Sequence, residues 1–400
     1  MRAPPHKVAV LFRYGLREHL DFLPALPRIL HELNDQEVEV HHFGFRGGGD
    51  LPEDLVPLVT VHGGLFHVRR ESEWDKHFKA VLWLMGLPFL GLKLQRQGFL
   101  TVFVDETLPL SAFLLRLSYR GKLMFTVHDF FLEVYGEPLR VLRGLGRRVQ
   151  ALDLKEWRKL DRVFTRVEAA KKALVEKGLE PEKISVVPDA VDLTLFHPLK
   201  DPNQRKEFRE TWGISTEDVV VVHHGIMHLN KGNRLLVEAL ARVRDRLPQV
   251  KLLFIGDGPE MKELRHAIEE LDLKDRVILT GWLPGLRDIS KALQASDIGV
   301  VMRKGLPGDH FHVTSTLVHN LACGLPVLSV RLDGICERIQ DGKQGLFFDP
   351  ECGEEFDQKL IQLVEHPEMR LKMGRLARRK AEESFDPKRI AGDYVKGLCG

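Results

Sequence analysis

A lysine beside glycines at the start of a helix is the first feature that could do chemistry. Lys231 and Gly232 follow a strand-like run that ends at Gly225, and an amphipathic stretch begins at Asn233. Glycine lets a ligand approach the backbone, a helix N-terminus offers unbonded N–H groups, and lysine adds a mobile positive charge. The spacing predicts an anion or phosphate site; a solvated lysine at a helix start is the equal alternative at this point.

A second glycine-rich turn, Gly256-Asp257-Gly258, follows the strand-like run 251–255. Pro259 suits the first turn of the helix after it. Met261 occupies the third glycine position of the dinucleotide-binding pattern G-x-G-x-x-G, and no matching acidic strand end follows. The turn therefore disfavours a nicotinamide or flavin enzyme.

The segment 305–327 predicts a second phosphate site at a helix start. Thr314 and Ser315 are good N-caps, Thr316 follows them, and Gly324 suits the residue after the helix. Charged side chains precede this helix start: Arg303 at a strand end, and Asp309 in the loop.

Histidines lie nearby, but they do not predict a metal site. The spacing of His310, His312 and His319 matches no zinc signature, so we expect no bound metal. Another histidine, His128, ends a strand-like run and precedes Asp129, where it could hydrogen-bond a substrate hydroxyl.

Composition limits the class of protein that carries these residues. The chain has 400 residues, which exceeds what a single hydrophobic core usually reaches, so we expect two domains. The 59 Lys and Arg balance 57 Asp and Glu, so no bulk charge favours a nucleic-acid partner. The four cysteines form no C-x-x-C pair, which favours reduced thiols in a cytoplasm.

The elements that must position these residues alternate between short apolar runs and longer amphipathic stretches. This rhythm predicts α/β units on parallel sheets, whose ligands bind at the carboxyl ends of the strands. The predicted strands are 8–12, 38–45, 58–62, 100–105, 123–128, 162–167, 184–189, 218–225, 251–258, 276–282, 297–302, 325–330 and 345–349.

Three segments between these strands carry separate expectations. The stretch 18–33 reads as one amphipathic helix whose first turn Pro24 and Pro27 put in doubt, and 190–217 reads as a polar linker between the halves. The uncharged run 80–92 is too short to span a bilayer and is interrupted by Pro88. Its length favours a helix packed in the core. The basic residues within 76–96 favour the alternative, a segment that lies on a membrane surface near a lipid acceptor.

Four segments together resemble the retaining GT-B glycosyltransferases of family 4. They are VVPDAVDLTLFHP, HHGIMHLNKG, LLFIGDGPEMKELRHAIEELDLKDRVILTGWLP and LVHNLACGLPVLSVRLDGICERIQDGKQGLFFDP. The resemblance covers about residues 184–384, and reaches the first half only through the strand rhythm and TVHD. It implies the GT-B fold: two Rossmann-like domains facing across a cleft.

The resemblance also implies that the two domains bind different substrates. Residues 1–195 would bind the acceptor, residues 196–384 would bind the nucleotide-sugar donor, and a closing helix in 385–400 would pack back on the first domain. The expected catalytic residues are His128 and Lys231, which the resemblance implies, and Asp309. The expected donor-binding residues are Asp257, Gly258 and Glu337, which the resemblance implies, and Gly225, Arg303, Thr314, Ser315, Thr316 and His319 from their places in the loops.

The sequence departs from the family pattern at four places. Ile226 replaces an arginine that contacts the diphosphate, and Asp189-Ala190 replaces Asn-Gly. Phe311 and His319 replace two glutamates, the second of which holds the ribose hydroxyls in the family. Asp309 could stand in for the first glutamate through a loop shift, and Arg303 for the missing arginine.

The favoured interpretation is a metal-independent, retaining sugar transfer from a nucleotide-diphosphate sugar to a hydroxyl acceptor, such as a polysaccharide, a glycolipid or a protein glycan. The donor is a substrate, and no cofactor is expected. We expect a cytoplasmic protein with no nucleic-acid partner. The alternative interpretation of 76–96 would make it peripheral at the inner membrane face. The departures leave open a catalytically inactive, glycosyltransferase-like binding subunit. A nucleotide-sugar epimerase or a phosphorylase is a third alternative.

Overall fold

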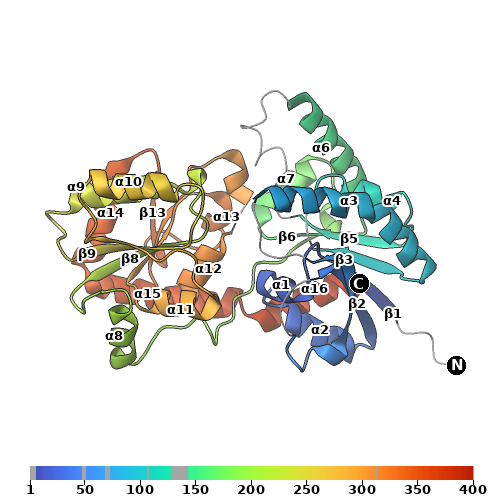
Figure 1. The fold of residues 1–400 in the computed structure, drawn as a ribbon, viewed down its shortest axis with the longest axis horizontal. Helices are drawn as coiled ribbons and strands as arrows, with labels where there is room; N and C mark the ends of the chain where they lie inside the picture. Colours follow the sequence, from blue (N-terminus) through green and yellow to red (C-terminus); the bar gives the residue numbers. More distant parts are fainter. Residues whose placement is uncertain are drawn as a thin grey trace. The chain divides into compact units, whose positions relative to one another are not determined.

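The computed structural model describes residues 6–46, 51–67, 73–105, 108–127, 143–311 and 313–399. The chain divides into two compact units, which are described separately (Figure 1). Unit 1 comprises Met1–Ala190 and Pro387–Gly400, and unit 2 comprises Val191–Asp386. Each predicted strand overlaps an observed one, so the predicted α/β class is confirmed.

Unit 1 is built on a parallel sheet of seven strands in the order β3-β2-β1-β4-β5-β6-β7. Buried Val, Leu and Phe side chains fill its central strands, which is typical of a sheet covered on both faces. The strands are β1 His6–Leu11, β2 Val38–Arg46, β3 Val59–His67, β4 Thr101–Val104, β5 Lys122–Thr126, β6 Arg162–Thr165 and β7 Ile184–Val186.

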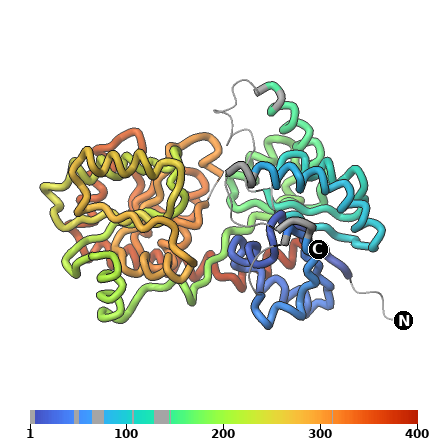
Figure 2. Tube along the Cα trace, viewed as in Figure 1, coloured from blue at the N-terminus to red at the C-terminus, as the bar shows by residue number. Residues whose placement is uncertain are grey.

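The helices of unit 1 include one from the far end of the chain. They are α1 Leu16–Phe22, α2 Leu26–Asp35, α3 Glu73–Arg96, α4 Ser111–Arg116, α6 Arg143–Trp157, α7 Glu168–Glu176 and α16 Pro387–Cys399. The last of these, red in Figure 2, packs beside the blue α2, and its buried residues Ile390, Tyr394 and Leu398 join the core that α2 forms with β1 and β2.

The stretch 18–33 is not one helix. Helix α1 ends at Phe22 and α2 begins at Leu26, with Pro24 between them and Pro27 in the first turn of α2. A proline within a helix removes a hydrogen bond and clashes with the preceding turn, whereas the first turn tolerates it. The two prolines therefore set the break and the restart.

Unit 2 repeats the architecture with a parallel sheet of six strands in the order β10-β9-β8-β11-β12-β13. The strands are β8 Val219–His224, β9 Val250–Ile255, β10 Val277–Leu279, β11 Ile298–Val301, β12 Val327–Val330 and β13 Gly345–Phe348. The helices are α8 Pro202–Glu210, α9 Asn233–Val243, α10 Met261–Glu270, α11 Leu286–Gln294, α12 Ser315–Ala322, α13 Asp333–Cys336, α14 Gly353–Glu365 and α15 Pro367–Ser384.

The predicted linker 190–217 is wrong in its middle. Helix α8 lies there, and its Arg209 is buried. The Arg209 guanidinium donates to the carbonyls of Ala295, Ser215, Thr216 and Asp218, and pairs with Asp297 at 2.6 Å. A buried guanidinium is tolerated because these acceptors satisfy it. The segment is thus an integral part of unit 2.

The apolar run 80–92 also differs from the favoured expectation. It lies within one continuous helix, α3, which passes through Pro88. The Ser118 hydroxyl donates to the Pro88 carbonyl, and α4 packs against α3. Only one face of α3 is buried, through Trp83, Leu87 and Leu94. The expectation of a helix packed in the core is therefore wrong for the other face.

Candidate active site

The loops after β8 and β9 meet at the carboxyl edge of the sheet in unit 2. Gly225 donates its N–H to the Ile255 carbonyl at 2.9 Å, and Met227 donates to the Asp257 carbonyl at 3.0 Å. A Cβ on Gly256 would lie 2.0 Å from the Gly225 carbonyl oxygen, and one on Gly258 would lie 2.4 Å from the Met227 oxygen. Glycine is required at both positions, because two backbones touch there. The Asp257 carboxylate accepts from the Gly258 N–H, so it fixes the turn itself.

Lys231 lies just before α9 and is half-buried in this edge. Gly232 ends the 3-10 turn with a φ of +60° and begins α9. Burial, together with the nearby Arg303 charge, lowers the pKa of the Lys231 ammonium to about 8, although Asp309 opposes this. Lys231 is therefore mostly protonated at neutral pH, and an anion that entered the site would reinforce its charge.

Arg303 and Asp309 form a nearly buried ion pair beside Lys231. Arg303 follows β11, and its Nη1 lies 2.5 Å from Asp309 Oδ1. The other carboxylate oxygen of Asp309 accepts from the Leu306 N–H at 3.0 Å. Both oxygens of Asp309 are thus engaged within the loop 303–309. The carboxylate holds Arg303 in place, which suits a positioning residue better than a group that touches substrate.

The start of α12 reaches the same edge through its hydroxyls. Thr314 caps the helix by accepting from the Leu317 N–H, and Thr316 donates to the His224 carbonyl at 2.9 Å. Ser315 is exposed. Thr316 therefore fastens the helix to the end of β8, Thr314 caps the helix itself, and Ser315 remains open to solvent.

His319, which replaces the ribose-binding glutamate of the family pattern, lies within an aromatic stack. Its ring stacks on Phe196 with centroids 4.0 Å apart, and its Nδ1 lies 3.3 Å from His224 Nε2. Burial lowers the pKa of His319 to about 4, and the pKa of His224 well below its usual value. His319 is therefore neutral at pH 7. Its Nδ1 faces His224, so Nε2 is the ring nitrogen that could contact a ligand.

These histidines predict that acid destabilises the protein. The fold holds His319 and His223 neutral, with pKa values of about 4, whereas unfolded histidine has a pKa of about 6.5. The unfolded chain binds the extra protons between these values, so stability is full above about pH 6.5 and falls as pH drops toward 4. We expect the melting temperature to fall from pH 7 to 5, and His319→Gln to reduce that fall. His266→Gln, at an exposed site, should leave the slope unchanged; an equal effect of both variants would contradict the assignment.

Two predicted residues do not join this group. Glu337 ends α13 and lines a separate hollow of about 340 Å³, together with Lys343 and Gln344, which precede β13. His128 lies outside the described residues. Among the described residues, no group of three His, Cys, Asp or Glu side chains is arranged to hold a metal ion.

Unit 1 contains a buried histidine cluster that the sequence analysis missed. His19 Nε2 lies 3.0 Å from Asp105 Oδ2, and His19 Nδ1 lies 3.2 Å from His42 Nε2. Phe12 stacks on the His19 ring. Asp105 directly follows β4, so a carboxylate at a predicted strand end was the available signal.

At another departure from the family pattern, Asp189 pairs with Arg166 at 3.0 Å.

Comparison with known proteins matches both halves of the chain to glycosyltransferase families. Residues 9–195 match the family described as Glycosyltransferase Family 4, and residues 204–380 match Glycosyl transferases group 1. The chain is 27% identical over 190 residues to N-acetyl-alpha-D-glucosaminyl L-malate synthase of Bacillus anthracis, which is 47% of each chain. It is 26% identical over 286 residues to 2-deoxystreptamine glucosyltransferase of Streptomyces kanamyceticus, which is 71% of each. Apart from the latter, the chain spans about half the length of the first curated relatives it matches.

Solved structures share the fold along the whole chain. HepE of Anabaena, crystallised with UDP and glucose, superposes with a TM-score of 0.73 at 18% identity, covering 99% of this chain and 100% of HepE. Sucrose-phosphate synthase of Thermosynechococcus elongatus gives a TM-score of 0.73 at 16% identity, over 98% of each chain. The family matches to both halves, joined in this fold, show that the chain belongs to the glycosyltransferases of the GT-B fold.

Proposed function

We propose that the protein transfers a sugar, with retention of its anomeric configuration, from a nucleotide-diphosphate sugar to a hydroxyl acceptor. The observation that carries this proposal is the carboxyl edge of unit 2. There, Gly256 and Gly258 let the loops after β8 and β9 lie in contact, the Cβ side of Gly225 has only Thr316 Oγ1 nearby, at 3.8 Å, and Lys231 and Arg303 supply positive charge. This combination suits a diphosphate. The HepE structures, which hold UDP and UDP-glucose, provide a fold-level precedent for such a donor.

Lys231 and Arg303 would act on the leaving group. As the bond from the sugar C1 to the diphosphate oxygen breaks, negative charge grows on the phosphate, and fixed cations stabilise it. Asp309 would keep Arg303 aimed at that charge while leaving Lys231 mobile. With both its oxygens engaged, Asp309 does not supply a nucleophile. The acceptor oxygen would then attack C1 on the face that the diphosphate leaves, and its proton would pass to a phosphate oxygen.

His319 would recognise the nucleotide ribose in place of a carboxylate. A glutamate accepts hydrogen bonds from two ribose hydroxyls, whereas neutral imidazole Nε2 offers one contact. We therefore expect His319→Glu to strengthen donor binding and His319→Ala to weaken it, each by about three- to tenfold, an effect typical of a single hydrogen bond. Calorimetric titration with UDP-glucose measures both. Equal affinity of the wild type and both variants for UDP-glucose would show that His319 does not contact the ribose.

The activity itself is tested by titrating the protein with a panel of nucleotide sugars, followed by product analysis with hydroxyl acceptors. Binding of one donor and formation of a glycoside with the anomeric configuration of that donor, read by proton NMR, would support the proposal. An inverted product would overturn retention. Failure to bind any donor would favour the inactive binding subunit, and sugar conversion without an acceptor would favour an epimerase.

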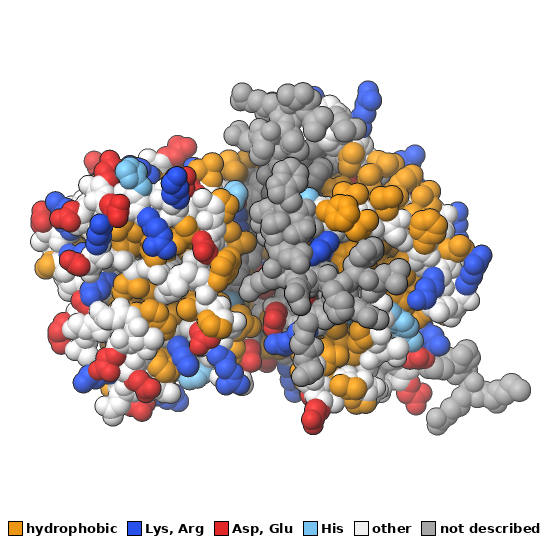
Figure 3. All heavy atoms as spheres, in the orientation of Figure 1, with side chains coloured by type: hydrophobic (Ala, Val, Ile, Leu, Met, Phe, Trp, Pro, Cys, Tyr) orange, Lys and Arg blue, Asp and Glu red, His pale blue; other side chains and the backbone are white. Residues whose placement is uncertain are grey.

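We also propose that α3 brings unit 1 to an anionic membrane surface, where a lipid-linked acceptor would lie. Five large apolar side chains at helical spacing are exposed along it, with Phe89 75% exposed: Phe78, Val81, Met85, Phe89 and Leu92. Figure 3 shows hydrophobic side chains gathered over this helix. His77–Arg96 is also the one segment of the described residues long and apolar enough to cross a membrane, with 17% of its apolar window buried.

Charge at the ends of α3 favours a surface position. Lys79, Lys93 and Arg96 belong to the same helix. Cations beside an apolar face are typical of a helix that lies in the headgroup region and contacts anionic lipids. The consequence is a peripheral protein of the cytoplasmic leaflet.

Vesicle flotation tests this surface. Wild-type protein should float with phosphatidylglycerol-containing vesicles and less with phosphatidylcholine alone. Met85→Glu/Phe89→Glu should lose at least about 90% of the bound fraction, because two charges replace apolar contacts. Val56→Glu/Leu100→Glu is the matched control at exposed apolar sites of the same unit. Equal loss in both double variants would contradict the proposal.

A further inference from the structure

Unit 2 contains a basic pocket at the end of its sheet opposite the candidate active site. Ser296 and Asp297 directly precede β11, and Leu325 and Pro326 directly precede β12, whereas Arg303 follows β11. Because the strands are parallel, the pocket and the candidate active site lie at opposite ends of the same strands. The pocket therefore is not part of the donor site.

The pocket forms where α15 crosses the turn between α12 and β12. Gly324 has a φ of +71°, and a Cβ on Gly374 of α15 would lie 2.3 Å from the Gly324 carbonyl oxygen. Two glycines thus let the helix approach the turn closely. The cavity has a volume of about 620 Å³, which lies within the range of small-molecule sites.

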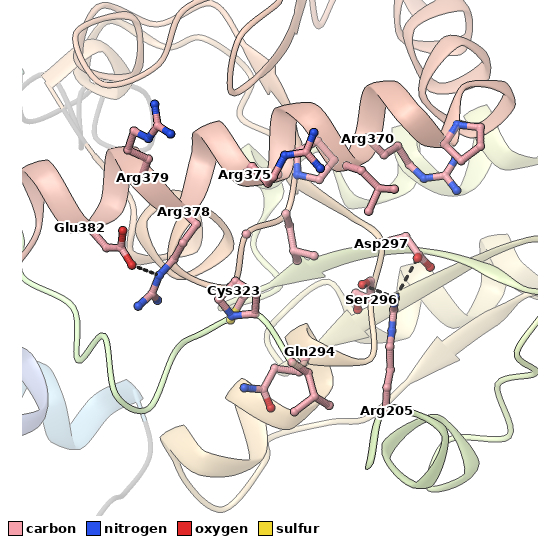
Figure 4. A pocket seen from close by; sticks show the side chains of 18 residues that line it. Arg205, Gln294, Ser296, Asp297, Cys323, Arg370, Arg375, Arg378, Arg379 and Glu382 are labelled. Carbon is pink, nitrogen blue, oxygen red and sulfur yellow. Dashed lines mark hydrogen bonds and ion pairs between the residues drawn. The ribbon is translucent and has the colours of Figure 1, made fainter. Parts of the chain in front are cut away.

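Arginines dominate the charge of this pocket (Figure 4). Five arginines and two carboxylates line it: Arg205, Arg370, Arg375, Arg378, Arg379, Asp297 and Glu382. Arg379 points away from Arg205 in Figure 4.

The two carboxylates do not balance these cations. Asp297 is shared, because Arg205 Nη2 lies 2.8 Å from it and the buried Arg209 lies 2.6 Å from its other oxygen. Burial lowers the pKa of Arg370 despite the attraction of Asp297, and the Arg205 charge adds to the lowering. An anion placed between these guanidinium groups would relieve their mutual repulsion.

Two of these arginines are held in place by hydrogen bonds within unit 2. Arg378 donates to the carbonyls of Phe196 and Ala322 and pairs with Glu382, and Arg370 donates to the carbonyls that end α14. Arg375 is exposed and pairs with no carboxylate of the described residues. The fixed guanidinium groups of Arg370 and Arg378 would bind phosphate oxygens with little further loss of side-chain entropy.

The rest of the lining is apolar. Pro198, Leu199, Leu325, Pro326, Pro367 and Leu371 contribute to the walls. Such walls contact an organic group and offer little to a bare inorganic ion. We propose that this pocket binds a small organic phosphate, with the phosphate at the arginines and the organic part against the prolines and leucines.

The test uses full-length Lys231→Ala protein, so that anion binding at the candidate active site is weakened, and titrates it with phenyl phosphate and inorganic phosphate by calorimetry at constant ionic strength. We expect one site, with phenyl phosphate bound at least about fivefold more tightly because of its apolar contacts. Adding Arg205→Gln/Arg375→Gln should weaken phenyl phosphate at least about tenfold, since two charge-assisted hydrogen bonds are lost.

The matched control is Lys206→Gln/Lys372→Gln, which removes two charges from the same helices at exposed positions outside the pocket. We expect less than about a twofold effect, because exposed charges are screened by salt. Equal weakening by the arginine and lysine pairs would overturn the site, as would the lack of phenyl phosphate binding. Equal affinity for phenyl phosphate and inorganic phosphate would show that the apolar walls do not contact an organic group. An acidic peptide is titrated as a third probe, and tighter binding of that peptide would overturn the small phosphate as the ligand.

Discussion

Lys231→Ala is expected to lower kcat for sugar transfer about 100- to 1000-fold. The expectation rests on the proposed function, in which Lys231 neutralises the leaving diphosphate in a partly buried site. Removing one fixed group that stabilises transition-state charge has an effect of about this size. Initial rates with saturating donor and acceptor measure it. Lys231→Arg keeps a cation and should retain more activity than alanine; equal rates for the two variants would show that charge at this position is not required.

The same lysine gives donor binding a distinct pH dependence. Burial and Arg303 lower the Lys231 pKa to about 8, so the ammonium is lost as pH rises from about 7.5 to 9.5. We expect the affinity for the nucleoside diphosphate to fall up to about tenfold per pH unit above this pKa. Arginine stays protonated throughout this range, so Lys231→Arg should remove the fall. A wild-type affinity that stays constant to pH 9.5 would contradict the assignment.

Gly256→Ala is expected to lower the free energy of unfolding of unit 2 by more than about 4 kcal/mol, an exceptional loss for one methyl group. The new Cβ would lie 2.0 Å from the Gly225 carbonyl oxygen, and φ is +128°. Neither backbone can retreat, because Gly225 is bonded to Ile255 and Gly256 is bonded to Gly281. The loop at the candidate active site would therefore open. Urea unfolding, followed by circular dichroism, measures the loss.

Gly281→Ala provides the matched control. Gly281 pairs with Gly256 in the same bridge and has a φ of +66°, but no atom lies within 4 Å of the position of its Cβ. We expect a loss of about 1–2 kcal/mol, the cost of a left-handed backbone for a residue other than glycine. Comparable losses in the two variants would show that backbone strain, and not close approach of the loops, sets the requirement for Gly256. If Gly256→Ala yields no soluble protein while Gly281→Ala does, the prediction stands.

The sequence predicted the sheets well because their buried strands are short, apolar and evenly spaced. It also predicted that Lys231 and the glycine turns lie at one end of the second sheet, since the carboxyl ends of parallel strands determine where such residues meet. It failed at α8, where a polar composition hid the buried Arg209. The acceptors of that guanidinium, including Asp297, lie far along the chain, so no local pattern could reveal them.

The role of Asp309 shows a second limit of sequence reasoning. An acidic residue in a glycine-rich loop suggests catalysis, and its ion pair with Arg303 depends on how the loop 303–309 curls. For α3, Pro88 indicated a break, yet packing against α4 and the hydrogen bond from Ser118 sustain the helix. The curl of the loop decided the first outcome and the tertiary contacts of α3 decided the second, and local composition encodes neither.

Helix α16 imposes an order on the synthesis of this chain. Its residues Ile390, Tyr394 and Leu398 complete the core of unit 1, although they are made after the whole of unit 2. Unit 2 is a continuous stretch of sequence, so it can fold as soon as it leaves the ribosome. Unit 1 must instead wait, with the apolar face of α2 uncovered, until α16 has also left the ribosome. During synthesis, the half made first is therefore the half finished last, and a chain stalled before residue 387 would expose that face to chaperones and proteases.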